Sequence, residues 1–101
     1  MARVIWTDPA LTDLEAIADY IARDSPRQAS LFVQRAFRAA DRLEVFPQLG
    51  RIVPEIGESS VRELMLRPYR IVYVLRETDA LVVLVHHAAR PLGAADLPDD
   101  V

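Results

Sequence analysis

The side chains best suited to chemistry lie in the last third of the chain, and two of them are the adjacent histidines His86 and His87. Both follow a run of apolar, β-branched residues, so they are expected at the end of a β-strand. Neighbouring side chains on a strand point to opposite faces, and the two imidazoles therefore cannot bind one metal ion together. Two interpretations remain: one histidine acts as a general base, or one packs and the other caps the strand end.

Arginines are the second candidate for chemistry, because every basic side chain in the sequence is an arginine. Three of them are expected to converge around the predicted sheet: Arg62, Arg70 and Arg90. Such a cluster would bind phosphate or an acidic partner. The alternative is ion pairing with Glu63, Glu77 or the acidic tail, and side-chain direction decides between the two. Arg51 is a further binding candidate, with an ion pair to Glu55 as its alternative.

Other familiar catalytic patterns are absent from the sequence. It has no cysteine, no glycine-rich phosphate loop, no nucleophile elbow and no zinc signature. No pair of acidic residues suggests glycosidase or metal chemistry. We therefore expect no metal ion and no cofactor. The aromatic residues Trp6, Tyr69 and Tyr73 are interpreted as packing residues.

Two helices precede these residues in the sequence. A short apolar run at 3–6 predicts a first strand. Apolar residues at helical spacing then predict a helix that is capped by Asp8 and ends near Asp24. A capping box at Ser25–Gln28 begins a second helix, which ends before Pro47. Because the link between the helices is only about two residues, they must lie antiparallel as a hairpin.

Three strands are predicted after an irregular segment at 48–60. They cover 61–66, 69–75 and 81–87, and the last is apolar on both faces, as is typical of a central strand. The element order is β-αα-βββ. It predicts an α+β fold in which the helical hairpin packs on one face of a mainly antiparallel sheet.

One face of this sheet is expected to remain uncovered, because the hairpin can cover only the other. Alternation along 69–75 places Arg70, Val72 and Val74 on that face, together with Arg62. A partly apolar, arginine-lined face of this kind is a natural place for a macromolecular partner. The sequence therefore favours a protein that acts by binding a macromolecule over an enzyme with its own active site.

Composition limits the remaining possibilities. The 101 residues fit one domain at 1–92, followed by an acidic tail at 93–101 that is expected to be mobile. The net charge of −3 is a poor match to a phosphate backbone, so no direct DNA binding is expected. No apolar run approaches the ~20 residues that span a bilayer, and the N-terminus does not resemble a signal peptide. A cytoplasmic protein without membrane contact is the expectation.

Several short motifs, in this order, resemble the RelE/ParE superfamily of bacterial toxins, the toxin halves of type II toxin–antitoxin modules. They are Asp24-Ser25-Pro26 with Ala29, Phe46-Pro47, Gly50-Arg51-Ile52-Val53-Pro54-Glu55, Arg62-Glu63-Leu64, Tyr69-Arg70-Ile71-Val72-Tyr73 and His87-Ala88-Ala89-Arg90. The similarity runs from the first strand to Arg90, and the family topology, β-αα-βββ, matches the predicted order. It implies a cognate antitoxin, a ribbon-helix-helix or similar dimer, whose tail wraps the toxin.

The superfamily has two branches with different activities. RelE-like members cut mRNA on the ribosome, whereas ParE-like members bind DNA gyrase and trap it on cleaved DNA. Arg70 and Arg90 match two arginines of the RelE-like branch, but the lysines of the strand at 61–66 are not matched, and Asp96 stands about where a catalytic tyrosine would fall. His86 or His87 could substitute as the proton acceptor.

The acidic net charge also argues against a ribosome-directed nuclease. The resemblance thus favours a ParE-like gyrase inhibitor. The alternatives are a RelE-like endonuclease, with Arg70, Arg90 and His87 as its catalytic residues, and a non-toxic relative that only regulates its operon with the antitoxin.

Overall fold

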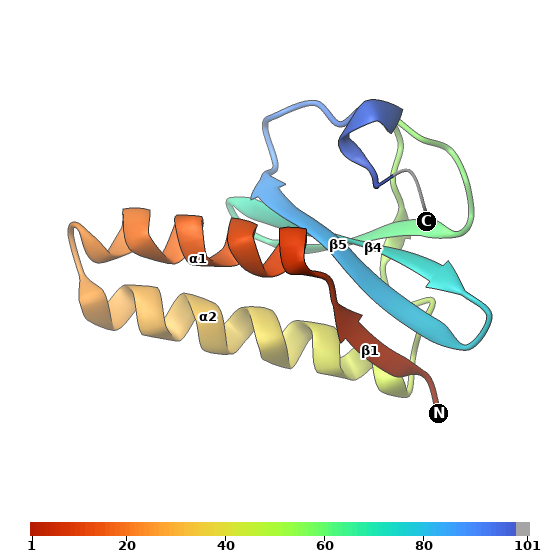
Figure 1. Ribbon diagram of the computed structural model, residues 1–101, viewed down its shortest axis with the longest axis horizontal. Coiled ribbons are helices and arrows are strands. Elements are labelled where there is room, and N and C mark those ends of the chain that lie inside the picture. Colours follow the sequence, from red (N-terminus) through yellow and green to blue (C-terminus); the bar gives the residue numbers. More distant parts are fainter. Residues whose placement is uncertain (99–101) are drawn as a thin grey trace.

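A helical hairpin packs against one five-stranded sheet in the computed structural model, which describes residues 1–98 (Figure 1). The elements are β1 (Arg3–Trp6), α1 (Asp8–Ala22), α2 (Pro26–Asp41), the 3-10 helix η1 (Arg42–Glu44), β2 (Arg51–Ile52), β3 (Val61–Leu66), β4 (Tyr69–Arg76), β5 (Asp79–His87) and the 3-10 helix η2 (Ala94–Asp96). The strand order is β1-β5-β4-β3-β2, with β1 parallel to β5 and the other pairs antiparallel. The predicted α+β fold is confirmed, and β5 is a central strand as expected.

The short strand β2 was missed, because Arg51 and Ile52 lie in a segment that reads as irregular. Two residues are too few to show an alternating pattern. The strand forms because it pairs with β3, where Arg51 is opposite Glu63 and Ile52 is opposite Arg62. This pairing decides where the side chain of Arg51 goes.

The cap of α1 differs from the prediction. Thr7, not Asp8, is the capping residue, and its hydroxyl accepts a hydrogen bond from the backbone N–H of Ala10 at 3.4 Å. The same hydroxyl donates to the carbonyl of Val82 in β5 at 2.8 Å, so it also fixes the helix start to the sheet. Asp8 is instead the first residue of the helix, where its negative charge suits the helix dipole. The cap of α2 is as predicted, because the Ser25 hydroxyl accepts from the N–H of Gln28 at 3.1 Å.

The first core lies between the hairpin and the sheet. Its buried residues are Ala10, Leu14, Phe32, Ala36, Ala40, Leu43, Ile71, Tyr73, Ala80, Val82 and Val85. The aromatic residues pack here as expected: the Trp6 ring lies 4.8 Å from that of Phe37, and Tyr69 meets Phe32 edge-on at 5.2 Å. This core is the one that the helical and strand periods predict.

A second core occupies the opposite face of the sheet, and the prediction of an uncovered face is therefore wrong. Its buried residues are Val53, Val61, Val72, Val74, Val83, Leu84 and Leu92, with Ile56, Leu81 and Leu97 packed against them. The cover comes from two irregular segments, the connection after β2 and the chain after β5 (Figure 1). No periodic pattern marks such segments, which is why sequence reasoning left the face bare.

The residues after β5 pack against the sheet as far as the structure describes them. Leu92 is buried, η2 follows, and Leu97 lies against the second core. We call residues 90–97 the C-terminal strap. Asp99 and Asp100, two of the predicted acidic tail residues, lie outside the described residues, and the domain boundary at 92 and the mobility of the tail stay predictions. Within residues 1–98, no helix is long and apolar enough to cross a membrane.

Candidate functional site

Arg70 is the centre of a buried polar network beneath the C-terminal strap. Its side chain is only 4% exposed. The guanidinium donates to the carboxylate of Glu55 at 2.7 and 3.2 Å, to Glu63 Oε1 at 2.9 Å and to the backbone carbonyl of Arg90 at 2.8 Å. Its Nε donates to Nε2 of His86 at 3.1 Å. Every guanidinium nitrogen of Arg70 thus has a partner inside the protein.

Strand register brings this network together. Arg70 on β4 is directly opposite His86 on β5 and Met65 on β3, so Arg70 and His86 share a face. Glu63 lies two residues from Met65 on β3 and therefore points to the same face. Glu55 reaches the network from the connection that covers this side of the sheet, which ties that connection to β4.

Glu63 belongs to this network, and sequence reasoning considered it only as an alternative ion-pair partner for the arginines. Its side chain is fully buried, and it accepts hydrogen bonds from both Arg51 and Arg70. Two arginines therefore compensate one buried carboxylate. The alternative partner proposed for Arg51, Glu55, is wrong, because the pairing of β2 with β3 places Arg51 opposite Glu63.

The charges in the network reinforce one another. The hydrogen bond from Arg70 lowers the pKa of Glu55 to about 2, with a further contribution from the backbone N–H of Leu92, which donates to Glu55 at 3.0 Å. The same carboxylate raises the pKa of Arg70 above its ordinary value. Burial, and then the positive charges of Arg70 and Arg90, lower the pKa of His86. A neutral His86 suits its role as the acceptor for Arg70.

His86 and His87 point to different surroundings, as their adjacent positions on a strand predicted. His87 is exposed, its Nδ1 accepts from the backbone N–H of Ala89 at 3.1 Å, and its ring meets Tyr69 edge-on at 5.6 Å. One histidine packs into the network and the other caps the end of β5. In the part of the chain that the structure describes, no group of three acidic, histidine or cysteine residues could hold a metal ion.

The three arginines expected to converge have separate partners. The prediction that Arg62 shares a face with Arg70 is wrong, because the register places Arg62 opposite Tyr73 on the hairpin face of the sheet. Arg62 donates to the backbone carbonyls of Ser59 at 2.9 Å and Gly50 at 3.0 Å, and so holds the chain around β2. Arg90 is exposed and reaches Asp96 at 3.5 Å. Arg70 is enclosed by the network. The alternative to an anion-binding cluster was ion pairing within the protein. The pairs of Arg70 with Glu63 and of Arg90 with Asp96 agree with that alternative.

Val72 and Val74 are inside the protein rather than on a binding face. Val72 is fully buried and Val74 is 6% exposed, both under the strap and the β2–β3 connection. The prediction that they line an open surface fails for the physical reason given above: two irregular segments cover them. A partner can touch them only after this cover moves.

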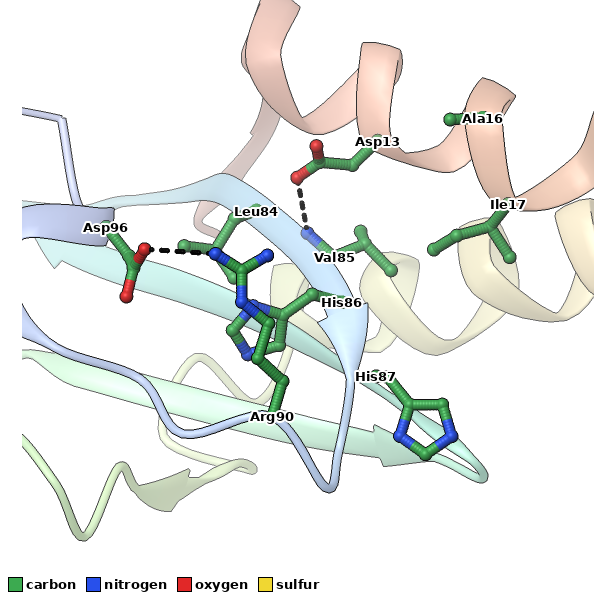
Figure 2. A pocket seen from close by; sticks show the side chains of 9 residues that line it. All are labelled: Asp13, Ala16, Ile17, Leu84, Val85, His86, His87, Arg90 and Asp96. Atoms are coloured by element: carbon green, nitrogen blue, oxygen red, sulfur yellow. Dashed lines mark hydrogen bonds and ion pairs between the residues drawn. The ribbon is translucent and has the colours of Figure 1, made fainter.

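A hollow of about 410 Å³ lies beside the network, between α1 and the last part of β5 (Figure 2). It is lined by Asp13, Ala16, Ile17, Leu84, Val85, His86, His87, Arg90 and Asp96. Because β1 pairs only with residues 79–82, the edge of β5 that faces away from β4 has no neighbouring strand here. Asp13 takes the place of one, accepting from the N–H of Val85 at 3.0 Å, as Figure 2 shows. No sequence signal marks Asp13, which lies off the apolar stripe of its helix.

The side chains of the network that could take part in acid–base chemistry already have partners within the protein. The Nε2 of His86 already accepts from Arg70, so it could take a proton only by giving up that hydrogen bond. Arg90 is paired with Asp96, and Arg70 with two carboxylates. The cations that would stabilise a phosphate are thus neutralised from within the protein.

Comparison with known proteins identifies the family. Residues 4–92 match the model of the ParE toxin of type II toxin–antitoxin systems, parDE. The chain belongs to the ParE toxin family. It is 41% identical to Toxin RelE2 of Caulobacter vibrioides over 91 residues, which cover 89% of this chain and 99% of that protein.

Two further matches extend the comparison of this ParE-family toxin. The putative toxin Y4kP of Sinorhizobium fredii is 38% identical over 93 residues, covering 88% of this chain and 93% of that one. The solved structure of a chromosomal ParDE system from P. aeruginosa superposes with a TM-score of 0.71 at 24% identity, covering 86% of this chain and 96% of the other. At that identity the structural match concerns the fold. The chain is therefore a toxin of a type II toxin–antitoxin system by family, and its fold agrees.

Proposed function

We propose that this ParE-family toxin inhibits DNA gyrase by protein–protein binding, stabilises the cleaved DNA that gyrase forms, and catalyses no reaction of its own. A cognate antitoxin, a ribbon-helix-helix or similar dimer, neutralises it. Gyrase inhibition is the activity that the sequence resemblance implies for the ParE-like branch.

The observation that carries this proposal is the enclosure of Arg70. In a nuclease of the RelE-like branch the matching arginine is expected to meet the RNA. Here Arg70 is 4% exposed and paired with Glu55 and Glu63. Two carboxylates at hydrogen-bond distance would repel the scissile phosphate of an RNA. An arginine in this setting stabilises a fold better than a transition state.

The position of Asp96 supports the same conclusion. Asp96 stands about where the RelE-like branch has a catalytic tyrosine, and it binds Arg90 and the backbone N–H of Gly93. The net charge of −3 further disfavours binding to the ribosome, which is a polyanion. These features support protein–protein contact as the proposed mode of action.

One observation favours the alternative, a ribosome-dependent mRNA endonuclease. The relative at 41% identity is named Toxin RelE2, and His86, His87 and Arg90 all line one hollow. If this alternative holds, mRNA cleavage is lost in Arg70→Ala or His87→Ala. The two activities are therefore tested side by side.

The deciding experiment is gyrase supercoiling with and without the purified toxin, scored for linear cleaved DNA. Gyrase inhibition predicts loss of supercoiled product and accumulation of linear DNA that carries covalently bound gyrase. The toxin with DNA but without gyrase is the control, because linear DNA there would indicate a nuclease. Normal supercoiling at micromolar toxin, together with mRNA cleavage on added ribosomes, would replace gyrase with the ribosome as the target.

The residues that contact the antitoxin are also a proposal. Arg51, Arg62 and Arg90 carry exposed or half-buried side chains and can meet it directly, whereas Arg70, Val72 and Val74 can do so only if the strap is displaced. Amide exchange at residues 70–74 and 90–97 separates the two modes. Strap displacement predicts faster exchange at 90–97 and protection at 70–74 in the complex, and unchanged exchange at both segments rules out contact at this face.

A further inference from the structure

The connection between α2 and β2 presents large apolar side chains to solvent. Val45 is 58% exposed, Phe46 59% and Leu49 40%, and with Pro47 and Gln48 they line a shallow hollow of about 390 Å³. We call Val45, Phe46 and Leu49 the apolar pad. Scattered apolar residues on a surface need no explanation, but a contiguous group around a hollow is typical of an interaction site.

The backbone beneath the apolar pad is held rigidly from inside the protein. The buried hydroxyl of Tyr73 donates to the carbonyl of Pro47 at 2.8 Å and accepts from the N–H of Gly50 at 2.9 Å. Arg62 donates to the carbonyls of Gln48 at 3.3 Å and Gly50 at 3.0 Å. Gly50 permits this close approach, because a Cβ there would lie 2.5 Å from the carbonyl oxygen of Glu63. The pad is thus preorganised rather than a loose loop, which lowers the entropic cost of binding.

A row of arginines leads along α2 to the apolar pad. Arg35 and Arg38 lie on α2, Arg42 caps its end as the first residue of η1, and all three are exposed. Their spacing of three and four residues places them on one face of the helical chain. We call these three residues the arginine ridge. None of the ion pairs found within residues 1–98 involves an arginine of the ridge. Arg42 precedes Val45 and Phe46 by three and four residues, and the N–H of Phe46 donates to the carbonyl of Arg42 at 3.0 Å. The ridge and the pad therefore meet within one helical turn.

The charge of this region is opposite to that of the rest of the chain. Residues 26–44 contain four arginines and two acidic residues, Asp41 and Glu44, whereas the remaining sequence contains eight arginines and thirteen acidic residues. A positive strip on a negatively charged protein selects an acidic partner by charge complementarity. The neighbouring helix α1 carries the exposed acids Glu15 and Asp19, which would repel a long polyanion lying across the hairpin.

We propose that the arginine ridge and the apolar pad form one docking surface for an acidic protein segment that carries an apolar or aromatic anchor. The acidic side chains pair with Arg35, Arg38 and Arg42, and the anchor fills the hollow beside Phe46. Exposed aromatic and arginine side chains are the residues most often responsible for binding energy at protein interfaces. Within residues 1–98, none of the hydrogen bonds or ion pairs of the Arg70 network involves a side chain of the ridge or the pad, and the proposal does not depend on whether gyrase or the ribosome is the target.

The test uses a fluorescein-labelled acidic peptide as the probe. The peptide is roughly 16 residues long, about 24 Å as a helix, with glutamates at helical spacing and a Leu-Phe pair one turn beyond them. Anisotropy measures its binding to the full chain, and amide chemical shifts map the site. We expect saturable binding, with shifts concentrated at residues 35–49. A version with lysines in place of the glutamates should not bind.

Matched variants make the test specific. Arg42→Glu and Phe46→Ser should each weaken binding about tenfold, whereas Arg27→Glu, the same charge change at the start of the same helix, should alter it less than about twofold. Both critical side chains are exposed, so thermal unfolding should show that these variants remain folded. Equal losses of peptide affinity in Arg42→Glu and Arg27→Glu would mean that the peptide responds only to the net charge of the protein, and this result would overturn the proposal.

Two further outcomes would also overturn it. One is the absence of saturable binding of the acidic peptide at millimolar concentration. The other is tighter binding of a DNA duplex of similar length, with the same amide shifts, because that result would make the surface a nucleic-acid site. Neither outcome bears on gyrase inhibition, which the supercoiling assay decides separately.

Discussion

The two faces of the sheet are covered in different ways. On one face, two regular helices bury an apolar core that includes Leu14, Phe32 and Leu43. On the other, the strap and the β2–β3 connection bury a core made mainly of valines. The first face is held mainly by apolar packing, with single hydrogen bonds from Thr7 and Asp13 to β5, whereas the second also has the buried charged network of Arg70, Glu55 and Glu63.

The difference teaches how an irregular cover is kept in place. Neither segment over the second core has a long helix or strand whose backbone hydrogen bonds could satisfy it. Arg70 supplies the missing contacts: it binds Glu55 in the connection and the carbonyl of Arg90 in the strap, and Glu55 in turn accepts from Leu92. One buried side chain thus joins two segments that do not pair with each other as strands.

The largest expected effect comes from removing that side chain. Arg70→Leu leaves the buried carboxylate of Glu63 with Arg51 as its remaining partner, and removing one member of a buried pair costs about 3–5 kcal/mol. Urea unfolding followed by circular dichroism measures the loss. The control is Arg27→Leu, an exposed arginine of α2, for which a change within about 0.5 kcal/mol is expected.

A double variant sharpens this first prediction. Arg70→Leu combined with Glu63→Leu removes both buried charges and should recover part of the lost stability, because an apolar pair often replaces a buried ion pair without cost. If the double variant is less stable than the sum of the single losses predicts, the network contributes more than mutual charge compensation, and the contrast between the two faces is larger than described.

The next effect compares one leucine from each core. Leu43→Ala and Leu92→Ala both remove a buried side chain, at an expected cost of about 2–5 kcal/mol, with Leu92 nearer the lower end because it lies in a peripheral segment. Hydrogen exchange distinguishes them. Leu92→Ala should increase exchange chiefly at residues 92–97, whereas Leu43→Ala should increase it throughout the sheet. The same global pattern for both would mean that the strap is part of one cooperative unit with the hairpin.

The sequence predicted the first face well because that face is regular. Strands β1 and β3 cover the predicted ranges 3–6 and 61–66, and the Ser25 cap forms as its motif requires. The alternation along β4 also assigned each side chain to its correct face. Only the cap of α1 was misplaced, by one residue, because Thr7 and Asp8 are both good capping residues.

The second face could not be predicted, because its contacts join residues far apart in the chain. Glu63 reads as a polar position of a half-exposed strand, and its burial depends on Arg51 and Arg70 from two other strands. Asp13 likewise looks like a surface residue of α1, but β1 ends before it reaches Val85, and Asp13 accepts the hydrogen bond that the backbone N–H of Val85 makes on that side. Periodicity carries no information on such pairs.

A smaller effect is expected from pH, and Glu55 on the second face should contribute to it. The pKa of Glu55 is lowered to about 2 from an ordinary value of 4.5, so the folded state holds this carboxylate ionised more strongly than the unfolded chain does. Its contribution to stability is complete above about pH 4.5 and is lost as the pH falls toward 2. Glu55 is about one third exposed, so solvent screening moderates the effect.

Unfolding midpoints in urea between these two pH values provide the measurement. Glu55→Gln should flatten the decline that the wild-type chain shows. The matched variant Glu58→Gln removes a carboxylate from the same connection, but one that does not bind Arg70. It tests whether loss of any acidic residue in this connection flattens the pH dependence of stability. If the unfolding midpoint of Glu55→Gln falls with pH as steeply as that of the wild-type chain, groups other than Glu55 cause the pH dependence.

The smallest effect is expected at Arg90, and it tests which part of this residue holds the strap. Its side chain is 64% exposed and meets Asp96 at 3.5 Å, a geometry that contributes at most about 1 kcal/mol. Its carbonyl, by contrast, accepts from Arg70 at 2.8 Å within the network. Arg90→Ala keeps the carbonyl, so the free energy of unfolding should change by less than about 1 kcal/mol, and exchange at residues 92–97 should stay slow. A loss of stability as large as that of Arg70→Leu would mean that the exposed Arg90–Asp96 ion pair holds the strap. The cover of the second face would then be held at its surface rather than by the buried network beneath it.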